Sequence, residues 1–177
     1  MIEDPSSVAV ELVEVVDEAG TPIRTVSRAE MRLNRLRHRA VFVVVTNSAN
    51  ELLVHQRSDL KDLWPGRWDI AAGGVCAPGE TWEHAAAREL KEELGITAHL
   101  QPLADVKYSD DEVSLCGRVF RVRHDGPCTF EDGEVQQAKW IPGEALGSFL
   151  ADHLCCPDSA TVIPRLLRPD PPIGPPR

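Results

Sequence analysis

The residues best suited to chemistry lie in the middle of the sequence, where carboxylates gather around one arginine: Glu80, Arg88, Glu89, Glu92 and Glu93. If this stretch is helical, Glu89, Glu92 and Glu93 share one face, because residues three and four apart are neighbours on a helix. Like charges four residues apart cost a helix about 0.2–0.5 kcal/mol. A divalent cation with oxygen ligands, such as Mg²⁺ or Mn²⁺, would make the cluster favourable. The spacing therefore indicates metal-assisted chemistry, with a solvated charged face as the alternative.

A helix over residues 81–94 is needed to position these carboxylates, and both of its ends are marked. Thr81 is a good N-cap residue, and Gly95 stands where a left-handed C-terminal cap would lie. Between them, apolar side chains recur every four residues and form the stripe that is expected to face the core. These residues are Trp82, Ala86, Leu90 and Leu94.

The loop before this helix favours a ligand site. Gly73-Gly74 is predicted to end a short strand, and the chain returns at Glu80 just before the helix. Because glycine lacks a side chain, a backbone carbonyl at Gly74 can approach a metal or a phosphate closely. Arg88 is expected to pair with Glu92, four residues on, or with Glu80 if the loop folds back.

Nine positions of this region follow the pattern G-x5-E-x7-R-E-U-x-E-E-x-G-U, in which U is apolar: Gly74, Glu80, Arg88, Glu89, Leu90, Glu92, Glu93, Gly95 and Ile96. The pattern resembles the Nudix box, with every specified position satisfied. The resemblance implies a Nudix hydrolase that cleaves nucleoside diphosphates linked to another moiety, with Mg²⁺ or Mn²⁺ as its cofactor. It implies that Glu89, Glu92 and Glu93 bind the metal, and that Glu89 is also a candidate to orient the attacking water.

Further roles follow from the same resemblance. Arg88 and Glu80 would brace the loop and the helix. Family members often supply another acid from a loop before a late strand, and Glu134 is the matching candidate, as a base or a metal ligand. The chemistry suits these residue types, because metal ions neutralise a diphosphate and lower the pKa of bound water. A carboxylate beside that water can take its proton.

A wider stretch, 8–146, resembles the Nudix branch close to isopentenyl-diphosphate isomerase. This resemblance rests on Gln56-Arg57, Lys61 and the segment 64–68. In the isomerases, basic residues of this loop contact the substrate diphosphate, so Arg57 and Lys61 are the matching candidates for substrate binding. Exposed loop charges without such a role are the alternative.

The resemblance to the isomerases departs at the residues that their reaction needs. The isomerases use a cysteine just after the Trp68 strand, and Gly73 stands at that position here. Val75 replaces a metal-binding histidine, although His38 matches another one. Both departures favour hydrolysis by attack of water on phosphorus. An isomerase-like enzyme and a non-catalytic Nudix-fold ligand sensor remain the alternatives.

The composition is that of an ordinary globular protein, with 42% hydrophobic and 27% charged residues. A net charge of −9 argues against binding to nucleic acid polymers, which needs a basic surface. A small-molecule diphosphate stays compatible, because a cation can screen the local acid. The sequence contains no apolar run long enough to predict a membrane-spanning helix. Its N-terminus lacks a signal-peptide pattern. Five cysteines without a CxxC pair fit a reducing cytoplasm. The resemblance also allows a homodimer.

The rest of the sequence predicts strands alternating with few helices, which is an α/β pattern. Strands are predicted over 8–16, 40–45, 52–56, 68–72, 98–107, 113–122 and 135–141, with a turn over 17–22. Ser27 is expected to cap a short helix, and another helix is expected after Pro142. We expect a Nudix fold, an α/β/α sandwich with a mixed sheet, over residues 8–168. A flexible N-terminus (1–7) and a disordered Pro-rich tail (169–177) would flank it.

Overall fold

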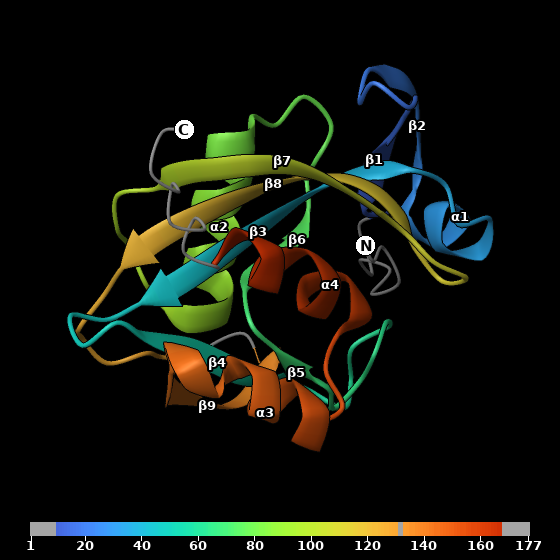
Figure 1. Ribbon diagram of the computed structural model, residues 1–177. Coiled ribbons are helices and arrows are strands. Elements are labelled where there is room, and N and C mark those ends of the chain that lie inside the picture. Colours follow the sequence, from blue (N-terminus) through green and yellow to red (C-terminus); the bar gives the residue numbers. More distant parts are fainter. Residues whose placement is uncertain (1–9, 131–132, 168–177) are drawn as a thin grey trace, which may run out of the picture.

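A mixed β-sheet with helices on both faces forms the framework of the protein (Figure 1). The computed structural model describes residues 10–130 and 133–167. The segments 1–7 and 169–177, predicted to be flexible and disordered, lie outside the described residues. None of the described helices is both long and apolar enough to cross a membrane.

Nine strands of the described chain belong to this sheet. They are β1 (Leu12–Val16), β2 (Pro22–Ser27), β3 (His38–Thr46), β4 (Glu51–Arg57), β5 (Trp68–Asp69), β6 (Ala72–Val75), β7 (Gln101–Ser109), β8 (Ser114–Arg123) and β9 (Val135–Pro142). Central β3 pairs in parallel with β8 and antiparallel with β1, β4 and β6. β7 pairs with β8, and β9 with β4. The expected mixed sheet is thereby confirmed.

Helices cover both faces of β3, as its unbroken apolar run predicts. Because side chains alternate along a strand, one set packs into a core with α3 (Leu146–Asp152) and α4 (Pro157–Leu166), and this set is Ala40, Phe42 and Val44. The other set packs under α2 (Trp82–Leu94), and it is Val41, Val43 and Val45. Figure 1 shows α2 and α4 on opposite sides of β3. The expected α/β/α sandwich is confirmed.

The β1–β2 hairpin and the short helix α1 (Arg28–Leu33) extend one edge of the sheet. Ser27 Oγ accepts the backbone N–H of Glu30 at 3.1 Å and caps α1, as predicted. α1 is thereby fixed directly after β2. Its arginines Arg28 and Arg32 contact Asp62 in the loop between β4 and β5.

The prediction of one strand over 68–72, ended by Gly73-Gly74, is wrong. The structure has two short strands here, because β5 pairs with β4 while β6 pairs with β3. Both glycines lie inside β6. A Cβ on Gly73 would lie 2.0 Å from the carbonyl oxygen of Val41. Only glycine therefore lets β6 approach β3 so closely.

Two further elements were not predicted from the sequence. β2 lacks an alternating apolar pattern, because its first four residues are all exposed. A proline inside a segment argues against a helix, yet α4 contains Pro164. The buried side chains of Val162 and Ile163 anchor α4 on the core, and they place Asp158 in its first turn. A short 3₁₀ turn, η1 (Gly143–Ala145), precedes α3.

Candidate functional site

Helix α2 presents its glutamates toward the sheet because its apolar residues anchor it there. Thr81 Oγ1 accepts the N–H of His84 at 3.2 Å, and Gly95 ends the helix with a φ of 67°. Ala86, Leu90 and Leu94 are buried as predicted, whereas Trp82 is only half-buried beneath the guanidinium of Arg39. All four residues of the predicted stripe thus face the core, with Trp82 at its partly exposed edge.

The three glutamates of the helix lie at different depths. Glu93 is 1% exposed and Glu89 is 8% exposed, so both carboxylates lie between the helix and the sheet. Glu92 is exposed at the rim. Burial raises the pKa of Glu89, and the nearby Arg88 only partly offsets this effect.

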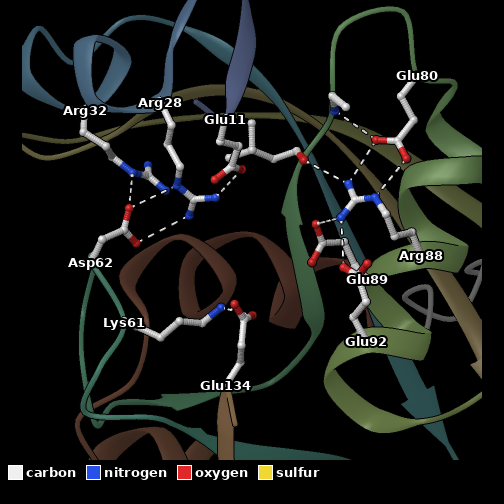
Figure 2. Close-up of polar contacts among 12 residues, drawn as sticks. Glu11, Arg28, Arg32, Lys61, Asp62, Glu80, Arg88, Glu89, Glu92 and Glu134 are labelled. Atoms are coloured by element: carbon white, nitrogen blue, oxygen red, sulfur yellow. Dashed lines mark hydrogen bonds and ion pairs between the residues drawn. The ribbon is translucent and has the colours of Figure 1, made fainter. Parts of the chain in front are cut away.

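Arg88 joins the loop before α2 to these carboxylates (Figure 2). Its Nε and Nη2 donate to the two carboxylate oxygens of Glu80, each at 3.0 Å. Its Nη1 lies 2.7 Å from Glu89 Oε1 and 3.1 Å from Glu92 Oε2. The carbonyl oxygen of Val75 accepts a further hydrogen bond from Nη2. The hydrogen bonds from Arg88 hold the pKa of Glu80 below its usual value. Arg88 is therefore placed to fix both the loop and the carboxylates.

Gly74 leaves the space that the Glu89 carboxylate fills. A Cβ on Gly74 would lie 2.5–2.7 Å from both oxygens and the carboxyl carbon of Glu89. These distances are well inside van der Waals contact. Any side chain at this position of β6 would push Glu89 out of its place.

Glu93 lies deepest, among buried polar groups. Its Oε2 accepts the N–H of Gly73 at 3.1 Å and lies 3.8 Å from Nε2 of His55. Its Oε1 lies 3.7 Å from Nζ of Lys61. Burial raises the pKa of Glu93 to about 8 and lowers the pKa of His55 to about 4. His55 is therefore neutral at pH 7, and its Nε2 has no hydrogen-bond partner within the described chain.

The loop between β4 and β5 brings both predicted substrate residues to the same region. Lys61 contacts the carboxylate of Glu134 (Figure 2). It also lies near the carboxylate of Glu93. Arg57 donates from Nη2 to the carbonyl oxygen of Leu63 at 3.1 Å, and its Nη1 lies 3.9 Å from Asp69 Oδ2. Its buried Nε has no partner within the described chain.

A cavity of about 200 Å³ connects most of these residues. The predicted residues that line it are Arg57, Lys61, Gly74, Arg88, Glu89, Glu92 and Glu134. Glu93 lies below its floor against Lys61, and Glu80 lies behind Arg88. His38, which matches an isomerase histidine, and Cys76, three residues after Gly73, are buried outside this lining.

The sequence reasoning missed several residues of the lining: Glu11, Arg28, Arg32, Asp69 and Asp158. Arg28 and Arg32 carry a detectable signal, because they are four residues apart in a predicted helix and so share one face. Asp158 carries none, since α4 itself was not predicted. Burial, followed by the negative charge of Asp69, raises the pKa of Asp158 to about 7.

The donor chemistry of the site suits a divalent cation. Within residues 10–130 and 133–167 no three His, Cys, Asp or Glu side chains already surround one point closely enough to hold an ion. Glu89 and Glu92 instead converge on one nitrogen of Arg88, and Glu93 faces Lys61. Carboxylate oxygens that converge on a cation are the ligands that Mg²⁺ and Mn²⁺ prefer.

Comparison with known proteins agrees with this site. A Nudix hydrolase of Pseudomonas aeruginosa, itself uncharacterised, is 37% identical over 150 residues, which cover 84% of this chain and 89% of that protein. An uncharacterised Nudix hydrolase of Yersinia pestis is 36% identical over 149 residues, which cover 82% of this chain and 81% of that protein. The crystal structure of DR0079 from Deinococcus radiodurans superimposes with a TM-score of 0.77 at 28% identity, covering 89% of this chain and all of the other.

These similarities confirm the expected Nudix fold and the hydrolase class. The finer resemblance to isopentenyl-diphosphate isomerase stays a prediction. The NUDIX domain family matches residues 36–166, which include the whole of α2 and the loop before it. The chain therefore belongs to the NUDIX domain family.

Proposed function

We propose that the protein is a metal-dependent pyrophosphohydrolase. It cleaves the diphosphate linkage of nucleoside di- or triphosphates, or of related nucleoside diphosphate derivatives, with Mg²⁺ as its cofactor or Mn²⁺ in its place. The observation that carries this proposal is that Gly74, Arg88, Glu89 and Glu92 line one cavity together with Arg57 and Lys61. Carboxylates for a cation and cations for a phosphate thus meet in one small space.

In this proposal each residue acts through the contacts described above. Glu89, Glu92 and Glu93, with the backbone carbonyl of Gly74, hold the ion. The bound ion supplies charge neutralisation of the diphosphate and a lower pKa of bound water. Arg88 and Glu80 keep the loop and the carboxylates in place.

Two basic side chains bind the substrate, and a carboxylate takes the proton of the attacking water. Arg57 and Lys61 bind the diphosphate oxygens. Water attacks phosphorus, its proton passes to Glu89 or Glu134, and the bond between phosphorus and the bridging oxygen breaks. The products are a monophosphate and the remaining phosphorylated fragment or orthophosphate.

The residues of this chain at or near the positions of the isomerase catalytic groups favour hydrolysis over isomerisation. Gly73 inside β6 has no thiol to offer. Burial raises the pKa of Cys76 to about 12 and lowers that of His38 to about 4. Neither side chain lines the cavity. The five cysteines form no disulfide, which supports our proposal that the enzyme works in the cytoplasm.

The test is release of phosphate and nucleotide over a substrate panel. The panel comprises nucleoside di- and triphosphates, dinucleoside polyphosphates, nucleotide sugars and isopentenyl diphosphate, each with Mg²⁺ or Mn²⁺. Glu92→Gln and Glu93→Gln should abolish turnover, whereas Glu83→Gln, on the exposed side of the same helix against Arg118, should not. Tight binding of one compound without turnover would refute the proposed enzymatic activity and support the ligand-sensor alternative. Conversion of isopentenyl diphosphate to its isomer would instead support the isomerase alternative.

A further inference from the structure

Two arginines of α1 meet at the end of the cavity away from α2. Arg28 and Arg32 lie one helical turn apart, and both line the cavity. Both reach the single carboxylate of Asp62, with Nε to Oδ2 distances of 3.1 Å and 3.3 Å. Figure 2 shows this pair across the cavity from Glu89 and Glu92. No role in the proposed hydrolysis uses these two residues.

The positive charge at this end has few anionic partners. Arg28 has two carboxylates, because Glu11 accepts a hydrogen bond from its Nη1 at 2.7 Å. Arg32 has only Asp62 as an ion-pair partner within the described chain, and it shares that carboxylate. Burial, together with the positive charges of Arg28 and Arg57, lowers the pKa of Arg32.

Arg57 adds a third guanidinium with unused hydrogen-bonding capacity. It lines the same cavity, and its side chain is 11% exposed. Its buried Nε has no partner within the described chain, and the carboxylate of Asp69 is 3.9 Å away. A buried donor without an acceptor is unfavourable. A ligand oxygen that enters the cavity could satisfy it.

We propose that Arg28, Arg32 and Arg57 form an anion site for a phosphoryl group of the substrate other than the one that water attacks. The carboxylate of Asp62, which pairs with both arginines of α1, would compete with the phosphoryl group for them. Guanidinium groups suit this ligand because their planar donors match phosphate oxygens in pairs. The proposal rests on the proposed function for the identity of the whole substrate. The binding of phosphate at this site does not depend on that function.

A structural explanation of the same contacts makes different predictions. If the ion pairs only fasten α1 to the loop, loss of any one of the three charged groups lowers stability, and phosphate binding does not change. If Asp62 competes with a phosphoryl group, its removal makes phosphate bind more tightly. Removal of either arginine of α1 then weakens binding. The opposite directions distinguish the two explanations.

The experiment is calorimetric titration of the whole 177-residue chain with inorganic phosphate, in EDTA and at constant ionic strength. Arg28→Gln and Arg32→Gln should each weaken binding by about fivefold to tenfold, the effect of losing one charge-assisted hydrogen bond at a partly exposed site. Asp62→Asn should tighten binding by about fivefold on the same reasoning. Arg24→Gln is the control, since Arg24 pairs with Glu30 on the outside of α1. It should leave phosphate affinity unchanged.

Two results would overturn the anion site. The first is that the wild-type protein does not bind phosphate. The second is that Arg32→Gln and Asp62→Asn change the free energy of unfolding but leave the affinity for phosphate unchanged. On any substrate that the panel identifies, Arg32→Gln should raise KM with kcat within about twofold, because it touches the non-reacting end. A panel without turnover would refute the proposed function. The metal-free titration would still decide the anion site.

Discussion

Replacing Gly74 by alanine tests whether the position of the Glu89 carboxylate sets the rate. The new Cβ would lie 2.5 Å from Glu89 Oε1, whereas ordinary contacts begin at 3.4 Å, so the carboxylate must move by about 0.9 Å. The obstructing group is the end of a side chain, so the free energy of unfolding should fall by only about 1 kcal/mol or less. A displacement near 1 Å in a reacting site can lower the rate about 100-fold.

The neighbouring glycine provides a matched comparison. A Cβ on Gly73 would lie 2.0 Å from the carbonyl oxygen of Val41, which is backbone and cannot rotate away. Gly73→Ala should therefore separate β6 from β3 and cost about 2–4 kcal/mol, or prevent folding. Gly147→Ala is the control, because nothing lies within 4 Å of its Cβ position. It should leave the rate unchanged and raise the free energy of unfolding by at most about 1 kcal/mol, because alanine favours a helix more than glycine does.

The assays are kcat at saturating metal and urea unfolding of the same preparations. Gly74→Ala should lose activity and keep its stability, while Gly73→Ala should lose stability first. A Gly74→Ala protein with kcat within about twofold of wild type would refute the link between Glu89 and the rate. Unfolding of Gly74→Ala as severe as that of Gly73→Ala would show that Glu89 cannot move aside.

Three further changes test the surrounding contacts. Arg88→Lys cannot reproduce the paired bonds to Glu80 together with the bond to Glu89, so kcat/KM should fall about tenfold or more in steady-state assays. Gly95→Ala places a Cβ 1.9 Å from Thr129 Oγ1 at a φ of 67°. It should lower the free energy of unfolding in urea by about 1–2 kcal/mol. Asp158 has a pKa raised by burial and Asp69 from 3.8 to about 7. The folded chain therefore keeps a proton that the unfolded chain loses, and stability should fall as pH rises between these values. Asp158→Asn should flatten this slope, which is at most about 1.4 kcal/mol per pH unit.

The sequence was most informative where local physics determines structure. Both ends of α2 could be predicted because Thr81 and Gly95 cap the helix through their own backbone and side-chain chemistry. β3 could be predicted because a strand covered on both faces must be apolar throughout. Both partners of Arg88 could be predicted, since Glu92 is four residues away on the helix and Glu80 lies in the loop just before the helix.

The rest depends on contacts between segments that are distant in the chain. The division of residues 68–75 into β5 and β6 depends on which strand each piece meets, and the local sequence does not specify this. α4 contains Pro164, which argues against a helix, and it forms because Val162 and Ile163 are buried. The convergence of α1 on Asp62 joins residues about thirty positions apart. Such a contact leaves no periodic pattern to detect.

The walls of the cavity come from segments as far apart as Glu11 and Asp158. A ligand that fills the cavity would therefore stabilise β1, α1, α2 and α4 together against local unfolding. The reason is that none of these elements could open while the ligand stayed bound. Backbone amides near both ends of the described chain should then exchange with deuterium more slowly as the ligand saturates the protein. The effect would extend to helices whose amides never touch the ligand. Ligand binding would thus couple the local openings of these four elements to one another.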